Sequence, residues 1–344
     1  MNAPDRARRR FIGITAAASA LALTPGLLRP AGAAPRTQAP AAPEPLSWRG
    51  VALGADAELR LYHPDSRVAQ QLLSQSLAEV HRLERVFSLY RADSALATLN
   101  RQGYLDAPPA DLVRLLGDSV YFGQITAGAF DLSVQPLWQL YADHYSRPDA
   151  DPAGPAAPAL RDALARVDYR AIRITPQRIQ LQRPGMALTL NGIAQGYITD
   201  RITELLRAGG LDRALVDLGE IRGLHTPAGP DAAPWRVGLA QPQSPDQVQA
   251  VVELRNQALA TSGGYGTPLD LAGRHTHLFD PHTGSAQPRY RSVSVLAANA
   301  TTADALSTAF SNMSLEAAAQ VAKPLGASAW FVLPDGSLRQ QAPG

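Results

Sequence analysis

The sequence contains no cysteine among its 344 residues. A chain without thiols has no disulfide, no thiolate nucleophile, no cysteine-ligated zinc and no lipid-modified cysteine. A strong excess of basic charge is also missing, because the formal net charge is only +2 and several arginines fall within the first ten residues. A nucleic-acid partner is therefore not indicated. The seven scattered histidines are too few for a histidine-rich metal store.

Long apolar runs and the common nucleotide motifs are absent too. After residue 33 no segment has the roughly 18 apolar residues that a membrane-spanning helix needs. The glycine-containing turn 191–197 lacks the GxGxxG spacing and the GK[ST] of a P-loop, and the turn around Ser262 lacks GxSxG. What is present is a chain that is 45% hydrophobic, long enough for one large domain or two small ones.

The N-terminus has the three parts of an export signal. A basic start that includes Arg8 and Arg9 precedes an apolar run, residues 11–28, and Ala31-Gly32-Ala33 offers a small-residue cleavage site. The paired arginines before Phe11 are typical of the twin-arginine type. We predict a signal peptide over residues 1–33, a Pro/Ala linker over 34–45, a domain over 46–338, and export to the periplasm. The alternative is an uncleaved membrane anchor.

Hydrophobic periodicity and turn signals predict the elements of the domain. Helices are expected from Ser66, over 110–125, from the turn at 191–197, and over 315–321. Strands are expected on both sides of Gly54 within 46–62, and over 172–174, 179–181, 187–190, 214–218 and 235–239. The segments 248–254 and 258–261 are expected to pair with each other, and 329–333 is expected to be the last strand.

The stretch 275–310 carries the most chemistry. Thr301 or Thr302 could cap a helix on which Asp304 and Thr308 lie four residues apart on one face. A carboxylate and a hydroxyl one turn apart are hard oxygen ligands that suit Mg²⁺. The alternative is a capped, half-exposed helix with an ordinary surface aspartate.

Other polar turns allow more than one interpretation. The turn at 191–197 exposes backbone N–H groups at a helix start, which suits a phosphate, but its glycines could serve only tight packing. The glycines beside Ser262 indicate that the backbone of this turn contacts a ligand. Asp131 is most simply a turn residue. His275, His277 and His282 could together hold zinc, although their spacing is not typical of such a site.

Six short motifs occur in an order that resembles the ApbE family, the FAD:protein FMN transferases. The similarity runs from about Trp48 to Leu333. The motifs are Phe87-Ser88-x-Tyr90-x-x-x-Ser94-x-Leu96-x-x-Leu99-Asn100; Gly128-x-Phe130-Asp131; Gly192-Ile193-Ala194-x-Gly196-Tyr197; Ala260-Thr261-Ser262-Gly263; His277-x-x-Asp280-Pro281-x-Thr283-Gly284; and Ala303-Asp304-Ala305-x-x-Thr308.

The resemblance implies an α+β (mixed α/β) fold, with short and mostly antiparallel sheets packed with amphipathic helices in two close lobes. It implies that FAD is cut at its pyrophosphate, that FMN is joined to a Thr or Ser of a target flavoprotein, and that AMP leaves. Asp304, Thr308 and the Gly192 carbonyl would hold Mg²⁺. His277 is the candidate for the base, as an imidazole poised near neutral pH, and the alternative is that it makes only a structural hydrogen bond. The FAD pocket would be lined by Leu53, Ser88, Tyr90, Ala129, Phe130, Asp131, Thr189, Gln195 and Leu278.

Four positions depart from the family pattern. The family usually has Asp at Thr189, Lys or Glu at Gln195, Gly-Gly-Asp at 219–221, and Met-Gly-Thr at 53–55. These changes are similar to the NosX-like branch, which serves a periplasmic flavoprotein in nitrous-oxide reductase maturation. The loss of charge at Gln195 bears on catalytic rate more than on flavin binding. Gln195 and Glu220 favour an alternative function, a periplasmic accessory protein that binds FAD or FMN without transferring it.

Overall fold

The structure is a computed structural model that describes residues 20–22, 44–52, 54–225 and 233–342. Its largest sheet has eight strands in the order β14-β13-β12-β11-β8-β7-β3-β2. Every pairing within it is antiparallel. The strands are β2 (Leu46–Ala52), β3 (Ala55–Tyr62), β7 (Arg213–Asp217), β8 (Ile221–His225), β11 (Ala258–Gly263), β12 (Ser292–Ala297), β13 (Ser328–Val332) and β14 (Leu338–Gln341).

Two smaller antiparallel sheets complete the strand structure of the described residues. One has the order β4-β6-β5 and the other β1-β9-β10. Their bounds are β1 (Ala20–Ala22), β4 (Tyr104–Asp106), β5 (Ile172–Ile174), β6 (Arg178–Leu181), β9 (Trp235–Gln241) and β10 (Ser244–Leu254). The α+β fold with mostly antiparallel sheets is thus confirmed. The predicted signal peptide and linker lie almost entirely outside the described residues.

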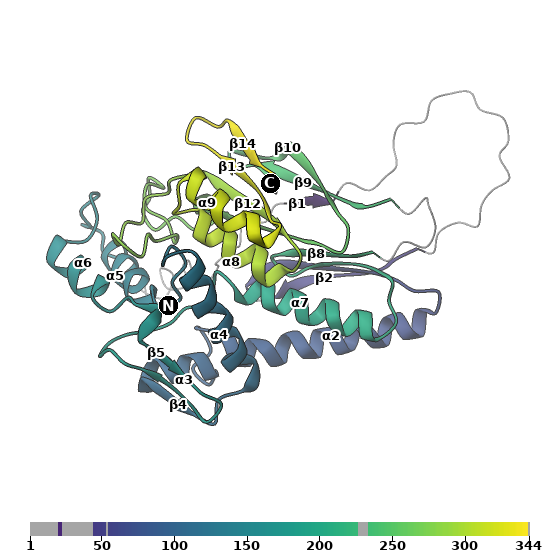
Figure 1. Ribbon diagram of the computed structural model, residues 1–344, viewed down its shortest axis with the longest axis horizontal. Coiled ribbons are helices and arrows are strands. Elements are labelled where there is room, and N and C mark those ends of the chain that lie inside the picture. The colour runs from purple at the N-terminus through teal and green to yellow at the C-terminus, as the bar shows by residue number, and fades with distance from the viewer. Residues whose placement is uncertain (1–19, 23–43, 53, 226–232, 343–344) are drawn as a thin grey trace.

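Helices cover one face of the large sheet, where α2, α7 and α8 run side by side (Figure 1). The helices are α2 (Ser66–Phe87), α3 (Ala95–Gln102), α4 (Ala110–Ile125), α5 (Gln135–Tyr145), α6 (Ala157–Leu164), α7 (Ala194–Ala208), α8 (Ala300–Phe310) and α9 (Leu315–Ala322). In the part of the chain that the structure describes, no helix is both long and apolar enough to cross a bilayer.

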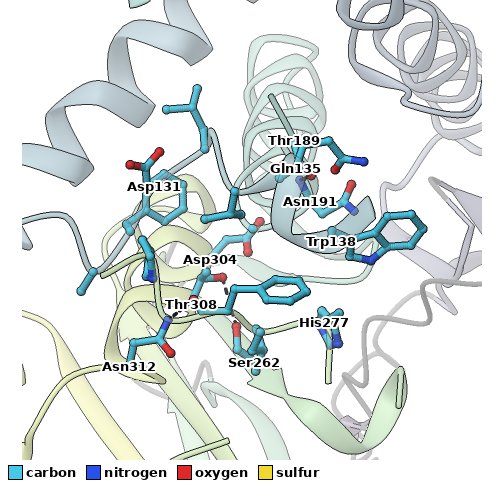
Figure 2. A pocket seen from close by; sticks show the side chains of 18 of the residues that line it. Asp131, Gln135, Trp138, Thr189, Asn191, Ser262, His277, Asp304, Thr308 and Asn312 are labelled. Atoms are coloured by element: carbon cyan, nitrogen blue, oxygen red, sulfur yellow. Dashed lines mark hydrogen bonds between the residues drawn. The ribbon is translucent and has the colours of Figure 1, made fainter. Parts of the chain in front are cut away.

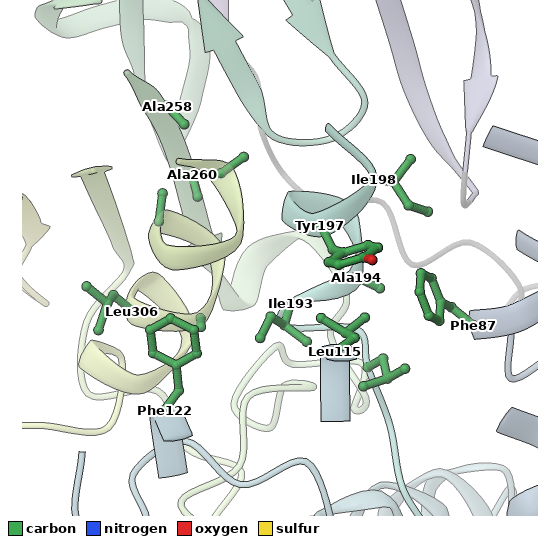
Figure 3. Packing of buried hydrophobic residues seen from close by; sticks show 14 of the residues in the cluster. Phe87, Leu115, Phe122, Ile193, Ala194, Tyr197, Ile198, Ala258, Ala260 and Leu306 are labelled. Atoms are coloured by element: carbon green, nitrogen blue, oxygen red, sulfur yellow. The ribbon is translucent and has the colours of Figure 1, made fainter. Parts of the chain in front are cut away.

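The main core lies between these helices and the sheet. Figure 3 shows Phe87, Leu115, Tyr197 and Leu306, from four different helices, packed into one cluster. The rings of Phe87 and Tyr197 meet edge to face with centroids 5.5 Å apart, a favourable aromatic geometry. This packing fixes α7 and α8 against each other, and both helices carry predicted site residues.

The approach of α7 to α8 depends on a glycine. A Cβ at Gly196 would lie 2.3 Å from the carbonyl oxygen of Ala300, far inside van der Waals contact. Only a residue without a side chain allows the two helices to come this close. The sequence interpretation of this turn as a helix start is confirmed, and the glycine also serves tight packing.

Three local predictions are wrong, each for a tertiary reason. Residues 187–190 are not a strand, because the side-chain amide of Asn100 bonds both the N–H and the carbonyl of Leu188. Strand β10 pairs with β9, whereas β11 lies between β8 and β12. The last strand of the described chain is β14, which continues the sheet beyond β13.

Candidate functional site

A cavity with about 930 Å³ of empty space, counted out to its open mouth, opens beside α5, α7 and α8 (Figure 2). It brings together most of the residues predicted from the sequence. These are Ala129, Phe130, Asp131, Thr189, Gly192, Gln195, His277, Leu278, Asp304 and Thr308.

A second hollow of about 950 Å³ adjoins the first. Ser88 and Tyr90 line it, and Asn191 and Gln195 line both hollows. The two predicted groups of FAD-lining residues therefore line neighbouring hollows. Leu53 lies outside the described residues, but the next residue, Gly54, lines the second hollow.

Asp304 is a buried carboxylate on α8, only 3% exposed. Its Oδ2 accepts a hydrogen bond from the Gly196 amide at 3.0 Å. Burial raises the pKa of Asp304 to about 7, and the nearby charge of Asp200 acts in the same direction. This helix begins at Ala300 with Asn299 as its N-cap, so the prediction of Thr301 or Thr302 as the cap is wrong.

Glu220, the second buried carboxylate of the cavity, is also 3% exposed. It accepts a hydrogen bond from the Thr261 amide at 3.3 Å. Burial and the charge of Asp304 raise the pKa of Glu220 well above its usual value. The described lining of the cavity includes no lysine or arginine, so no such cation offsets the three buried carboxylates Asp131, Glu220 and Asp304.

Hydroxyl groups surround the first carboxylate. Ser262 Oγ lies 2.7 Å from Ser307 Oγ and 3.3 Å from Thr308 Oγ1. A Cβ added at Gly192 would lie 2.7 Å from Thr308 Oγ1, so the backbone of residue 192 closely approaches this hydroxyl. The three predicted metal ligands, Asp304, Thr308 and Gly192, line one region, and their oxygens are of the kind that Mg²⁺ prefers. The residues present fit a hard divalent cation.

His277 reaches the cavity from the loop between β11 and β12 (Figure 2). Burial lowers the pKa of this imidazole to about 4, so the expectation of a pKa near neutrality is wrong. Its Nδ1 is buried and has no hydrogen-bond partner among the described residues. A hydrogen bond with the Thr267 backbone opposes the shift. The ring is neutral at pH 7.

Comparison with known proteins identifies the family. A profile described as the ApbE family matches residues 53–331, which is most of the chain. The protein belongs to the ApbE family. A relative from Treponema pallidum named FAD:protein FMN transferase is 33% identical over 319 residues, covering 84% of this chain and 85% of the relative. A protein of the same name from Klebsiella pneumoniae is 28% identical over 302 residues, covering 83% and 84%.

Solved ApbE structures share the fold. The flavin transferase ApbE from Vibrio cholerae aligns with a TM-score of 0.73 and 26% identity, covering 88% of this chain and 97% of that one. The ApbE protein from Thermotoga maritima aligns with a TM-score of 0.76 and 25% identity, covering 87% and 97%. The α+β architecture described above is thus the ApbE fold.

Some cavity residues of this ApbE chain serve its own structure. Asp131 Oδ1 accepts hydrogen bonds from the amide and hydroxyl of Ser133 at 2.7 and 2.6 Å, and its Oδ2 accepts from the Tyr169 amide at 3.0 Å. These contacts give Asp131 the turn role considered from the sequence. Gln195 lies against Gly219. A Cβ added at Gly219 would lie 2.3 Å from the Nε2 of Gln195.

Several lining residues of the ApbE site were not predicted. They are Gln135, Trp138, Asn191, Phe279 and Asn312 (Figure 2). Trp138 lies next to the matched Phe130-Asp131 motif in the sequence, and Asn191 precedes the matched glycine turn, so proximity to a motif was the available signal. Asn312 donates to the Phe279 carbonyl at 2.8 Å. No sequence signal pointed to Asn312 as a site residue.

The three histidines of the zinc alternative do not form a site. Among the described residues no group of three or more histidine, aspartate or glutamate side chains is placed to hold a metal ion. His275 instead pairs its Nδ1 with the Tyr145 hydroxyl at 2.8 Å. His282 lies against Gly128. The zinc interpretation therefore lacks its ligands.

Proposed function

We propose that the protein is an FAD:protein FMN transferase that modifies a Thr or Ser of a target flavoprotein and releases AMP. The hydroxyl oxygen attacks the phosphorus of the FMN half of FAD, and the bond from that phosphorus to the bridging oxygen breaks. AMP leaves with the bridging oxygen. Relatives across most of the chain carry this activity in their names. The observation that carries the proposal is a buried Asp304 on the same helix as Thr308, in a cavity that shares Asn191 and Gln195 with the hollow lined by Ser88 and Tyr90.

The metal assignment follows from the donor set. We propose that Asp304, Thr308 and the Gly192 carbonyl hold Mg²⁺. When bound, Mg²⁺ neutralises the negative charge of the pyrophosphate and of the departing phosphate. The raised pKa values of Asp304 and Glu220 support a cation here, because buried carboxylates without a counter-charge favour their neutral forms.

His277 is the candidate to accept the hydroxyl proton. Its side chain lines the cavity, and its Nδ1 has no hydrogen-bond partner among the described residues. A neutral imidazole with a free nitrogen can accept a proton there. A ring with a pKa of about 4 is a weak base, so it takes the proton only as the new oxygen–phosphorus bond forms.

The target and the location are proposed from the sequence. The signal-like N-terminus supports export to the periplasm, and the departures at Thr189 and Gln195 support a target in nitrous-oxide reductase maturation. The second candidate function is a carrier that binds FAD or FMN without transfer. Gln195 favours it, since a neutral amide stands where the family usually has a charged side chain.

One experiment separates these functions. The purified protein is incubated with FAD, Mg²⁺ and a candidate periplasmic target, and AMP is measured by chromatography while the target is analysed by mass spectrometry. A transferase releases AMP and adds the mass of FMN to Thr or Ser. FAD binding without AMP release or FMN addition contradicts the transferase and supports the carrier. Chelation of Mg²⁺ is the control for metal dependence.

A further inference from the structure

A third hollow lies outside the cavity that holds Asp304. Its empty space is about 970 Å³, and Gln135, Trp138 and Asn191 line both it and the catalytic cavity. Tyr90 lines it too and is shared with the second hollow. We call it the outer groove, defined by Leu89, Tyr90, Ala97, Arg101, Trp138 and Gln139. It borders the catalytic cavity at Trp138.

Trp138 has an unused donor at this junction. Its indole Nε1 is buried and has no hydrogen-bond partner. An indole N–H can only donate, and a buried donor without an acceptor costs free energy. By contrast, Trp235 donates its Nε1 to the Leu224 carbonyl at 3.1 Å. The N–H of Trp138 thus has no acceptor among the described residues, and a bound molecule can supply one.

The walls of the outer groove suit a peptide. Leu89, Ala97 and Ala187 provide apolar surface, while Asn100 and Gln139 bring amide groups. No carboxylate among the described residues lines it. The guanidinium of Arg101 donates to two neutral oxygens, the Ala92 carbonyl and the Thr98 hydroxyl. A segment rich in Lys or Arg would be repelled by this cation, whereas a neutral or acidic one would not.

We propose that the outer groove binds the extended segment of the target protein that carries the acceptor Thr or Ser, with the Trp138 N–H donating to a backbone carbonyl of that segment. This rests on the proposed function. Transfer requires two substrates side by side, because FAD occupies the inner cavities while the hydroxyl must reach its pyrophosphate. The outer groove meets the catalytic cavity at Gln135 and Trp138, so a segment lying in it brings a hydroxyl to the junction.

The first test fills the outer groove. Ala97→Trp places a large side chain in a wall that belongs to neither inner cavity. Ala78→Trp on the exposed face of α2 is the matched control. The probe is a pool of synthetic decapeptides with one fixed central threonine, and FMN addition is read by mass spectrometry. Ala97→Trp is expected to lower transfer at least tenfold without a twofold change in FAD affinity, while Ala78→Trp transfers as wild type. Equal transfer by both variants overturns the proposal.

The second test removes only the donor. Trp138→Phe keeps an aromatic ring but has no N–H, and Trp48→Phe, on β2 away from all three hollows, is the control. For a peptide selected from the pool, Trp138→Phe is expected to raise KM about fivefold, the usual effect of one neutral hydrogen bond. A rise in KM of less than twofold, or an equal rise in Trp48→Phe, contradicts the role of this donor.

A crosslinking measurement separates the groove from the reaction. Since the chain has no cysteine, Ala97→Cys carries a single thiol that can be labelled with a benzophenone. Irradiation with the peptide pool and FAD should capture peptide at residue 97 and not at a control Ala78→Cys. Capture without any FMN addition by wild type would support the groove while the proposed transferase function fails. No capture above the control, whether or not wild type adds FMN, overturns the groove.

Discussion

Asp200 on α7 holds the start of α8 through Thr301. Its Oδ2 accepts from the Thr301 amide at 2.8 Å and from the Thr301 hydroxyl at 2.6 Å. Its Oδ1 accepts from the Ala300 amide at 2.8 Å and from Arg222 Nη1 at 2.5 Å. One carboxylate thus ties together α7, β8 and the helix that carries Asp304.

We expect Asp200→Ala to destabilise the protein strongly. Removing one partner leaves the Arg222 charge buried and unpaired, which typically costs about 3–5 kcal/mol. Urea unfolding followed by circular dichroism measures the change. Arg91 pairs with Asp93 on the exposed surface, so Asp93→Ala is the control and should cost far less than Asp200→Ala, because solvent screens an exposed ion pair. Equal small losses in both variants would show that the Asp200 cluster contributes little.

We expect Asp304→Ala to keep the fold and most FAD affinity but to lose Mg²⁺-dependent AMP release. Much of the FAD affinity comes from its flavin and adenine surfaces, whereas the metal acts on charge that develops as the pyrophosphate breaks. A loss of about 4 kcal/mol of such stabilisation slows the step roughly a thousandfold. Stability need not fall, because a buried carboxylate with a raised pKa is removed.

The measurement is FMN transfer to a target peptide at saturating Mg²⁺, with FAD affinity followed by flavin fluorescence. Asp118→Ala is the control, since burial raises its pKa as well but it lies outside the catalytic cavity. Transfer by Asp304→Ala within a few fold of wild type would make Asp304 a residue without a metal role.

We expect Gly196→Ala to destabilise the protein by about 1–3 kcal/mol, the usual cost of overpacking. The new Cβ would lie 2.3 Å from the Ala300 carbonyl, which is backbone and cannot rotate away. Gly117→Ala in α4 is the matched control, since nothing lies within 4 Å of its Cβ. That variant should be neutral or more stable by up to about 1 kcal/mol. Thermal unfolding of both variants decides the matter, and equal melting temperatures would contradict the close helix contact.

We expect Asp217→Asn to change how stability depends on pH. Burial raises the pKa of Asp217 from 3.8 to about 6, although the Gly219 amide opposes the shift. Between these values the folded state binds more protons than the unfolded state, so the free energy of unfolding falls as pH rises through this window. Asp217→Asn has no carboxyl group at this position, so its free energy of unfolding does not fall for this reason. It should be more stable than wild type by about 1–2 kcal/mol at pH 7.5 and not at pH 4.

The comparison is made by urea titration at both pH values. Asp65→Asn serves as a control, because Asp65 lies on the surface at the start of α2. If Asp217→Asn changes the free energy of unfolding by the same amount at pH 4 and at pH 7.5, the raised pKa of Asp217 is contradicted.

We expect Arg8→Lys combined with Arg9→Lys to leave the protein in the cytoplasm. The prediction rests on the paired arginines before Phe11, which lie outside the described residues. Cell fractionation with immunoblotting measures the distribution, and Arg6→Lys alone is the control. Normal periplasmic accumulation of the double variant would contradict the twin-arginine type, although not export by another route.

The sequence by itself determined five of the described helices, α2, α4, α7, α8 and α9, and most strands, because their signals are local, whereas α3, α5 and α6 were not predicted. Asp65 before an apolar stripe predicted α2, and the structure shows its carboxylate accepting from the Arg67 amide at 2.8 Å. The same kind of signal placed Asp304 and Thr308 one turn apart on α8. Motif order then indicated which segments belong to one site, and most of their residues line one cavity.

Tertiary structure alone decided what depends on contacts between distant segments. Asn100 bonds Leu188, 88 residues away, and this contact replaces the expected strand. Burial is likewise a property of the packed fold, and it lowers the pKa of His277 to about 4 while raising that of Asp304. The outer groove with its unpartnered Trp138 N–H exists only once α3 and α5 lie beside the same cavity. A periodic pattern records which face of an element is apolar, but not which distant side chain will pack against it or exclude water from it.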